Sequence, residues 1–534
     1  MYIERVVVKN YRSLRDLNLT LKKGFNLIVG DNETGKSSLL EAINLCLKGQ
    51  LNRKPIRYEL HPFLFNVKAI EDYLNDLKNV GGALPPSIMV EVYLAECPPE
   101  LEHLKGTNNS LGFDTYGLSL IIELDEDNFS AQYRDYIADP EKLRTVPVEL
   151  YKVSRFAFSF DPIHQNVPPI RSTLIDPSEL SNTHHANKYL LELVEEQLED
   201  SERVQLSLTY RQLKDRFLEE EAVIEANAAL ARNEHLLANN ALTIGLDMTS
   251  RASWENTVQP HVNGIPIGLT GKGEQSNIKI RLAVEAANSS GVVLIEEPEN
   301  HLSHIRLHTL LGQLHERAGE RQFLISTHSS LVLNKLGVHN TIMFDGVTGI
   351  GLSDLDDSET ERYFRKLPGH DTLRMILAAK TILVEGPSDE LIVQKAYSQM
   401  HGVLPIENGV EVIAVQSLAF KRFLEIAKYL QRPVSVVTDN DGNPDAVREK
   451  YAEYVGVYPN ISIHYDANLH LPTLEPQICD VNELADLNAA LGRAFADKPA
   501  AEAWMLKNKT EAALLIADSQ INIRIPEYIA NAVR

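Results

Sequence analysis

Apolar and polar residues alternate along the first third of the chain in a way that predicts a sheet. Residues 1–21 alternate as a hairpin, and residues 25–29 (FNLIV) form a short apolar run that predicts a buried strand. Residues 38–47 follow with apolar side chains at helical spacing. Further strands are predicted at residues 87–95, 118–124 and 150–160. These patterns predict a sheet-rich lobe built around one strand–turn–helix unit.

The pattern changes twice in the remainder of the chain. Residues 178–240 are charged and helical, with Leu213, Phe217 and Val223 at approximately helical spacing. This apolar stripe would pack either against the protein's own core or against the same helices of a second copy, and we favour a dimerisation insertion. From residue 378 onward, strands and helices alternate, which predicts a parallel sheet with its sites at the carboxyl ends of the strands.

The turn after the first apolar strand, GDNETGKS at residues 30–37, has the spacing of a P-loop. Its two glycines permit a tight turn whose main-chain N–H groups point at phosphates, and the helix amino terminus adds partial positive charge. The lysine is expected to pair with the β- and γ-phosphates, and the serine hydroxyl to bind Mg²⁺. The expected ATP-binding residues of this run are Gly30, Asn32, Gly35, Lys36, Ser37 and Ser38.

A second apolar strand, VVLI at residues 292–295, ends in the acidic run EEPE and is typical of a Walker B segment. We expect this strand to lie beside the P-loop strand. Glu296 would then face the metal, and Glu297 would act as general base toward the attacking water. Upstream, residues 270–276 (TGKGEQS) open a helix whose small residues can face phosphates. Downstream, another strand ends at His328.

Carboxylates mark the strand ends in the last third of the chain. Glu385 follows one predicted strand, Asp439 and Asp441 follow another at D-x-D spacing, and Glu475 ends a strand-like stretch. Two carboxylates at this spacing can share one divalent cation, and a third from a neighbouring strand completes a hard oxygen site for Mg²⁺ or Mn²⁺. A bound cation would also offset the mutual repulsion of these acids.

Composition limits the class of protein. The 534 residues allow two or more domains, and the three scattered cysteines are too few for a disulfide framework or a zinc site. No apolar run reaches membrane-spanning length, so we expect a cytoplasmic protein with no membrane partner. The net charge of −22 argues against a chain coated with nucleic-acid-binding charge, although a local basic groove would still suffice to bind DNA.

The order of the first motifs resembles the ATP-binding cassette (ABC) ATPases of the chromosome-maintenance and recombination-repair type. In that family a Gly-rich signature meets the γ-phosphate across a head-to-head dimer, and a histidine after the next strand also senses it. The resemblance assigns the first role to Gly271, Gly273 and Ser276, and the second to His328. It implies a homodimer or higher homo-oligomer, formed through the ATPase and the helical insertion.

The last third resembles the Toprim domain of topoisomerases, primases and certain nucleases. The pair of Glu385 and Asp389, the Thr-Leu-Glu element at Glu475, and Lys509 resemble one branch in particular. This is the overcoming-lysogenization-defect (OLD) family, which fuses an ABC ATPase to a C-terminal Toprim domain. The resemblance implies a two-metal DNA endonuclease. In that scheme Glu385, Asp439 and Asp441 hold one cation, Asp389 and Glu475 hold the other, and Lys509, with Lys507 as the alternative, stabilises charge at the scissile phosphate.

The predicted fold class is therefore α/β: an ABC/SMC-type P-loop ATPase with a helical dimerisation insertion, followed by a Rossmann-like Toprim domain. Residues 1–168 and 243–376 are expected to form the two parts of the ATPase, residues 169–242 the insertion, and residues 377–534 the Toprim domain.

The resemblance also implies a function, an ATP-regulated endonuclease acting on double-stranded DNA in bacterial anti-phage defence. The implied cofactors are ATP with one Mg²⁺ or Mn²⁺, and two such ions at the Toprim site. Gabija-like and some retron systems suggest a defence partner protein, or retron RNA or DNA. The alternative is a repair or loading ATPase whose Toprim lobe only binds DNA. A topoisomerase or primase would need parts that nothing in the sequence resembles.

Overall fold

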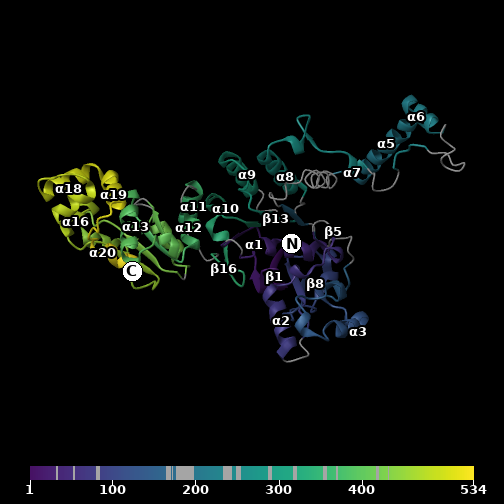
Figure 1. Cartoon of the computed structure of the whole chain (residues 1–534), viewed down its shortest axis with the longest axis horizontal. Coiled ribbons are helices and arrows are strands. Elements are labelled where there is room, and N and C mark those ends of the chain that lie inside the picture. The colour runs from purple at the N-terminus through teal and green to yellow at the C-terminus, as the bar shows by residue number, and fades with distance from the viewer. Residues whose placement is uncertain are drawn as a thin grey trace.

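The computed structural model describes residues 1–31, 34–51, 54–79, 84–163, 170, 172–175, 198–231, 243–247, 254–286, 291–316, 321–352, 358–367, 371–415, 420–430 and 432–534. The expected ATP-binding residue Asn32, part of the expected helical insertion and the side chain of Ser276 lie outside them. Figure 1 shows the N-terminal sheets, an arm of helices and a C-terminal lobe in yellow and green.

The first lobe begins with an antiparallel sheet in the order β2-β1-β6-β8-β7, with β9 also paired to β8. Its strands are β1 (Tyr2–Tyr11), β2 (Leu14–Thr20), β6 (Ile88–Ala95), β7 (Lys105–Gly106), β8 (Thr115–Leu124) and β9 (Tyr151–Ala157). The hairpin predicted at the amino terminus is the β1–β2 pair, in which Val6 lies opposite Leu19. The same part of the chain also contains β4 (Gln50–Leu51), β5 (Lys54–Pro55), α2 (Val67–Asn79) and α3 (Glu126–Tyr136).

A second sheet carries the nucleotide motifs, in the order β10-β13-β14-β3-β15-β16. Its strands are β3 (Phe25–Val29), β10 (Ser172–Ile175), β13 (Val292–Glu296), β14 (Gln322–Ser326), β15 (Thr341–Phe344) and β16 (Gly349–Gly351). The expectation that the Walker B strand β13 lies beside the P-loop strand β3 is wrong, because β14 pairs in parallel with both and separates them. The end of β14, which leads to His328, therefore lies between the two nucleotide motifs.

Helix α1 (Lys36–Lys48) packs between the two sheets. Its apolar residues Leu39, Leu40 and Ile43 belong to one hydrophobic cluster with residues from both sheets. Because side chains alternate along a strand, Ile28 of β3 faces this cluster, whereas Leu27 belongs to a second cluster on the opposite face. Helices α9 (His304–Glu316) and α10 (Ser330–Leu336) contribute to that second cluster.

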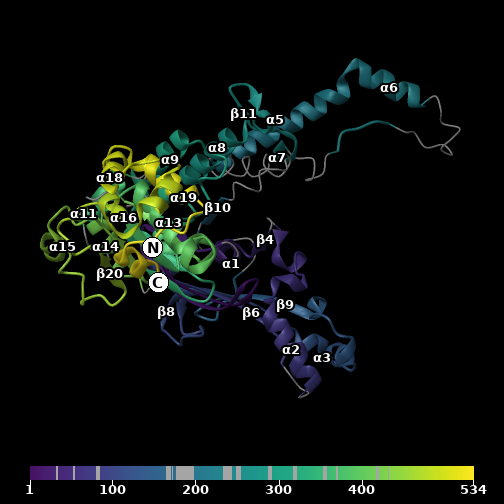
Figure 2. The ribbon, with the colours of Figure 1, turned by 60° about the vertical axis from the view of Figure 1, so that its left-hand side comes forward.

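The described part of the segment expected to form an insertion includes the helices α5 (Asp200–Glu219) and α6 (Glu221–Ala231). Figures 1 and 2 show both extending away from the sheets. Leu213 and Phe217 are 62% and 40% exposed, so the protein's own core does not cover them, whereas Val223 is buried. Strand β10, which also falls within this segment, pairs with β13 and belongs to the second sheet. Before β13 of the second sheet, the chain forms α7 (Trp254–Thr257), β11 (His261–Val262), β12 (Ile265–Pro266) and α8 (Lys272–Ala286).

The C-terminal lobe contains a parallel sheet in the order β18-β17-β19-β20. Its strands are β17 (Lys380–Val384), β18 (Val410–Ala414), β19 (Val434–Val437) and β20 (Ile461–His464). The main helices are α13 (Pro387–His401), α14 (Phe420–Ala427), α15 (Pro444–Lys450), α16 (Leu474–Val481), α17 (Leu484–Leu491), α18 (Lys498–Lys507), α19 (Lys509–Asp518) and α20 (Glu527–Val533). Helices cover both faces: α13, α16, α19 and α20 share one hydrophobic cluster with the sheet, and α14 packs in the other.

The two lobes share packed contacts. Helices α11 (Ser358–Lys366) and α12 (Thr372–Leu377) lie between them in the chain, and their residues Phe364 and Met375 join the cluster that also contains Leu333 of α10 and Phe423 of α14. One continuous apolar core therefore reaches from the P-loop sheet to the C-terminal sheet. Among the described residues, no helix combines the length and the apolar character needed to cross a membrane.

Candidate ATP-binding and carboxylate sites

The P-loop forms the turn between β3 and α1. Gly35 precedes α1 with a φ of +95°, in the left-handed region that side chains disfavour. A Cβ atom at Gly30 would clash with the carbonyl oxygen of Phe344, on the neighbouring strand β15. Both positions therefore require glycine for the turn to form.

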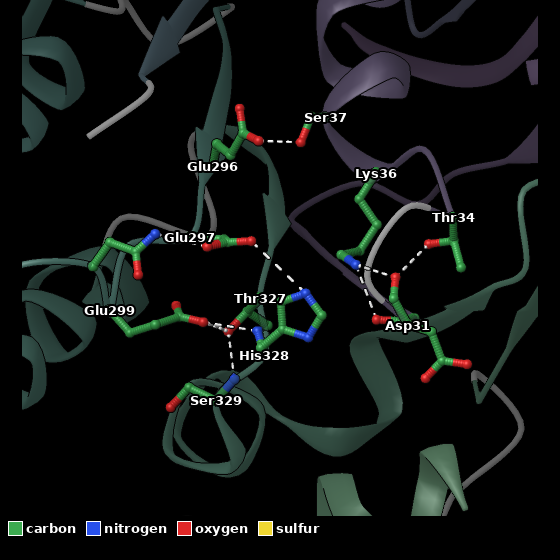
Figure 3. A network of polar contacts seen from close by, with 12 residues as sticks. Asp31, Thr34, Lys36, Ser37, Glu296, Glu297, Glu299, Thr327, His328 and Ser329 are labelled. Carbon is green, nitrogen blue, oxygen red and sulfur yellow. Dashed lines mark hydrogen bonds and ion pairs between the residues drawn. The ribbon is translucent and has the colours of Figure 1, made fainter. Parts of the chain in front are cut away.

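Lys36 lies across this turn. Its side chain is buried, and its ammonium donates hydrogen bonds to the carbonyl oxygens of Gly30 (2.9 Å) and Asp31 (2.8 Å). Burial lowers the pKa of Lys36, while the charges of Glu297, Asp31 and Glu296 act in the opposite direction. Figure 3 shows Lys36 facing the acids that follow β13.

Ser37 and Glu296 meet directly. The Ser37 hydroxyl donates a hydrogen bond to Oε1 of Glu296, the last residue of β13. A P-loop serine and a Walker B acid are the protein side chains that share Mg²⁺ in P-loop ATPases, so their donor set fits this cation. Ser38 lies on the other side of the helix start, where its hydroxyl is 3.4 Å from that of Ser13.

Glu297 and His328 face one another above the sheet. Glu297 Oε1 lies 3.7 Å from His328 Nε2, and Glu297 Oε2 accepts a hydrogen bond of 2.7 Å from the Asn300 amide. Burial, then the positive charge of Lys36, lowers the pKa of His328 against the effect of Glu297. A carboxylate and a histidine in this position can polarise a water or sense a phosphate.

Glu299 belongs to the same network, although the sequence did not identify it as a site residue. Its Oε1 accepts hydrogen bonds from Thr327 Oγ1 (2.8 Å) and from the main-chain N–H of His328 (2.7 Å). Burial raises the pKa of Glu299. The carboxylate thus ties the loop after β13 to the loop after β14 (Figure 3).

The Gly-rich segment expected to contact the γ-phosphate of a second copy lies at the start of α8, which packs beside α9. Gly271 has open space around its Cβ position, whereas a Cβ at Gly273 would clash with the carbonyl oxygen of His301. Glu274 pairs with Arg306 of α9 at 2.6 Å. These contacts are with the loop and helix after Walker B.

In the C-terminal lobe, Glu385 reaches from the end of β17 to the end of β19. Its Oε1 accepts hydrogen bonds from Thr438 Oγ1 (2.5 Å) and from the main-chain N–H of Asp439 (3.1 Å). Because β17 and β19 are parallel, their carboxyl ends meet at one edge of the sheet. Thr438 is a contact that the spacing of the acids did not indicate.

Asp389 and Glu475 join this group from helix starts. Asp389 lies in the first turn of α13 and accepts a hydrogen bond from Gly386 N (3.1 Å), and Glu475 lies in the first turn of α16. Burial and the charge of Glu385 raise the pKa of Asp389 to about 6. Burial, then the charges of Asp389, Glu385 and Glu475, raises the pKa of Asp439 to about 8. The four carboxylates are therefore close enough to repel one another.

A lysine offsets part of this repulsion. Lys509, the first residue of α19, lies 3.3 Å from Oε2 of the buried Glu475 and lowers the pKa of Asp439. The alternative lysine, Lys507, is at the exposed end of α18. Asp441, the second acid of the D-x-D pair, is exposed and has a φ of +48°. We refer to Glu385, Asp389, Asp439, Glu475 and Lys509 as the carboxylate cluster.

The chemistry of the carboxylate cluster fits a hard divalent cation, because such ions take carboxylate oxygens and relieve their repulsion. The side chains are not yet arranged as a ligand set: within the described residues, no three histidine, cysteine, aspartate or glutamate side chains are positioned to hold a metal ion. Glu385 is engaged by Thr438 and Asp439, and Glu475 by Thr473 and Lys509. Cation binding would have to redirect these oxygens.

Protein-family models match the two lobes separately, as the nucleotide motifs and the carboxylate cluster lie in different lobes. An AAA domain model matches residues 5–92, and a second one, described as "AAA domain, putative AbiEii toxin, Type IV TA system", matches residues 167–334. The model "Overcoming lysogenization defect protein-like, TOPRIM domain" matches residues 376–441. Domains of these kinds use ATP and Mg²⁺.

Curated relatives of this chain include DNA replication and repair proteins RecF. That of Acetivibrio thermocellus is 40% identical over 53 residues, which cover 10% of this chain and 14% of the relative. That of Bacillus cytotoxicus is 29% identical over 166 residues, 29% of this chain and 41% of the relative. Each alignment thus spans less than half of the relative's length.

Two solved structures align with about two thirds of the chain at low similarity. An Smc head bound to the C-winged helix domain of ScpA gives a TM-score of 0.34 at 15% identity, covering 66% of this chain and 99% of that chain. The structure of the recombination mediator protein RecF with ATP gives a TM-score of 0.34 at 13% identity, covering 65% of this chain and 98% of that chain.

The family models therefore place ATPase sequence and an OLD-like Toprim domain in one polypeptide, with the α/β fold predicted for both. This combination matches an ATPase–Toprim protein of the overcoming-lysogenization-defect family.

Proposed function

We propose that this protein is an ATP-regulated, divalent-metal-dependent DNA endonuclease, in which the C-terminal lobe cuts and the N-terminal lobe senses nucleotide. The observation that carries the proposal is the carboxylate cluster at the carboxyl edge of the Toprim sheet. The combination of an ATPase with an OLD-like Toprim domain supports ATP-dependent nucleases as the broad class.

The residues of the cluster have distinct proposed roles. Glu385 and Asp439, with Asp441, would hold one Mg²⁺ or Mn²⁺, and Asp389 with Glu475 the other. Paired divalent cations stabilise the attacking and leaving oxygens of an in-line phosphodiester displacement. Lys509 would stabilise negative charge on the scissile phosphate, since its ammonium already lies at the edge of the cluster.

Contacts between the lobes support regulation by ATP. Helix α10 begins shortly after His328, and two hydrogen bonds join it to α12: Thr372 Oγ1 donates to Asn334 Oδ1 (2.7 Å), and Leu373 N donates to Ser330 Oγ (3.4 Å). Helix α12 in turn leads into β17, which ends before Glu385. A movement of the His328 segment would therefore reach the carboxylate cluster through packed and hydrogen-bonded elements.

The proposed partners are double-stranded DNA and a second copy of the chain. The exposed apolar residues on α5, among them Leu213 and Phe217, would pack in the dimer. By family resemblance we further propose a role in anti-phage defence, with a partner protein or retron nucleic acid as trigger.

The test is plasmid cleavage by the purified full-length protein with Mg²⁺ or Mn²⁺, with and without ATP. Asp439→Ala should abolish cutting and leave ATP binding intact, because Asp439 and the P-loop lie in different lobes. Lys36→Ala should abolish both ATP binding and the effect of ATP on cutting. Cutting that persists in Asp439→Ala would refute the assigned site.

The second candidate is a repair or loading ATPase whose Toprim lobe only binds DNA. The partial matches to DNA replication and repair proteins RecF favour it. It predicts DNA-stimulated ATP hydrolysis with no metal-dependent cutting under any condition, including after addition of a partner. The same cleavage assay, with phosphate release measured in parallel, separates the two candidates.

A further inference from the structure

We propose that Asn440, the residue between the two acids of the D-x-D turn, is a positioning residue that fixes this turn against the loop leading to Glu475. The inference rests on the proposed nuclease function, and assigns to Asn440 control over the geometry, and hence the affinity, of the cation site. Asn440 itself would not contact the cation.

The side chain of Asn440 is 1% exposed, and both ends of its amide are used. Nδ2 lies within hydrogen-bond distance of three main-chain carbonyl oxygens, those of Asp466 (2.8 Å), Asn468 (3.0 Å) and Leu471 (3.1 Å). Oδ1 accepts a hydrogen bond from Gly442 N (2.7 Å). The Asn440 amide thus binds the loop of residues 466–471 through its nitrogen and the D-x-D turn through its oxygen.

The two segments are joined again at the next residue. The main-chain N–H of Asp441 donates to the carbonyl oxygen of Pro472 at 3.1 Å. Pro472 lies just before Thr473, whose hydroxyl donates to Glu475 Oε2 at 3.0 Å. The position of Glu475 relative to Asp439 is therefore set through the loop that Asn440 holds.

This arrangement distinguishes Asn440 from a residue that only stabilises the fold. A smaller side chain would remove the amide donor that the three carbonyl oxygens share. Two of them would keep another donor, Leu471 N for Asn468 and Gln477 Nε2 for Leu471, but the loop would lose its side-chain link to the D-x-D turn and shift relative to it. Such a movement changes the separation of Asp439 and Glu475. Residues that orient metal ligands in this way typically change metal affinity about 10–100-fold when they are replaced.

The same lobe contains a matched control. Asn460 directly precedes β20, at the end of the sheet where its strands begin. Its Nδ2 lies near three carbonyl oxygens, those of Ala427 (2.9 Å), Leu430 (2.6 Å) and Arg432 (3.3 Å). Its Nδ2 therefore links three carbonyl oxygens as that of Asn440 does, although Asn460 is less deeply buried, and the loop it holds lies at the other end of the strands from the carboxylate cluster. Asn440→Ala and Asn460→Ala should both lower the melting temperature.

The experiment measures Mn²⁺ binding to the full-length protein without nucleotide, by electron paramagnetic resonance. Asp439→Ala identifies which binding belongs to the carboxylate cluster. Asn440→Ala should weaken that binding at least about 10-fold, whereas Asn460→Ala should change it less than about two-fold. Asn440→Leu, which keeps the approximate size and removes the donor without adding charge, should also weaken binding, and serves if the alanine variant does not fold.

Equal Mn²⁺ affinity in wild type and both Asn440 variants would overturn the inference and leave the proposed nuclease untouched. An equal loss in the Asn460 and Asn440 variants would also overturn it, since general loosening of the lobe would then explain the effect. Absence of Mn²⁺ binding in the wild type would instead refute the proposed function, and the inference with it.

Discussion

The hydroxyl of Ser37 donates a hydrogen bond to Glu296 although 259 positions separate the two residues in the chain. This contact joins the P-loop to the end of β13, and the next acid, Glu297, faces His328 rather than the P-loop serine. Neighbouring acids of one strand end are thus directed to different partners. In the proposed roles, Glu296 would bind Mg²⁺ together with Ser37, and Glu297 would act as general base toward the attacking water.

Glutamine substitutions should separate these two roles. Glu297→Gln removes a general base without changing size, so ATP hydrolysis should fall about 10²–10⁴-fold while ATP binding is retained. Glu296→Gln, its matched control, should weaken Mg²⁺-dependent ATP binding. Phosphate release and titration with a fluorescent nucleotide measure the two quantities. The reverse pattern would exchange the two assignments.

Replacing Glu299 should affect both stability and hydrolysis. Glu299→Ala leaves the Thr327 hydroxyl and the His328 N–H without their acceptor, which should lower the free energy of unfolding by about 1–3 kcal/mol. The His328 segment should then lose its fixed position, and ATP hydrolysis should fall. Glu299→Gln, which keeps an acceptor oxygen, should recover most of the stability in denaturant titrations. No difference between the alanine variant and wild type would show that the network is dispensable.

Local patterns account for what could be predicted from the sequence. The strand β3, the turn with Gly30 and Gly35 and the helix α1 are contiguous, so the spacing of glycines and apolar residues is sufficient to predict them. The acids after β17 and β19 could be identified for the same reason, since they directly follow apolar runs.

The pairing order of the strands could not be predicted in this way. Nothing local indicates that β14 separates β13 from β3, because this order depends on pairing between segments that lie far apart in the chain. The contact of Glu299 with Thr327 depends on that order, and the contact of Glu385 with Thr438 depends on the pairing of β17 with β19 in the C-terminal sheet. Threonines at strand ends are also too common to signal a site by themselves.

The two lysines after α16 offer a direct comparison. Lys509 lies 3.3 Å from Glu475, whereas Lys507 is at the exposed end of α18. Lys509→Ala should therefore reduce metal-dependent cutting about 10²–10³-fold, the effect of removing one donor that stabilises charge in a transition state. Lys507→Ala should cut at nearly the wild-type rate. Equal losses in both variants would indicate a general contribution to DNA binding instead.

The pKa values in the carboxylate cluster imply a pH dependence of stability without metal. Unfolded aspartate has a pKa of about 3.9, whereas that of Asp389 is about 6 and that of Asp439 about 8 in the fold. Between these values the folded protein keeps protons that the unfolded chain has lost. The contribution of both groups to stability is thus complete below about pH 4 and lost as pH rises toward 8.

The melting temperature in EDTA should accordingly fall between pH 5 and pH 8.5, and less steeply in Asp439→Asn, which removes the group with the larger shift. Mg²⁺ should stabilise the wild type more at pH 8 than at pH 6, because the cation binds deprotonated carboxylates. The difference between wild type and Asp439→Asn isolates this effect from all other titrating groups. Parallel curves for the two proteins would contradict the raised pKa.

Thr372→Val should weaken the coupling between the lobes. Valine keeps the shape of the side chain but removes the hydroxyl that donates to Asn334 in the interface of α10 and α12. ATP binding and metal-dependent cutting should each persist, while the change in cutting rate on adding ATP should diminish. The control is Thr341→Val, in the P-loop sheet, which removes a buried hydroxyl that has no hydrogen-bond partner among the described residues. If ATP changes cutting equally in wild type, Thr372→Val and Thr341→Val, the signal must pass between the lobes by another route.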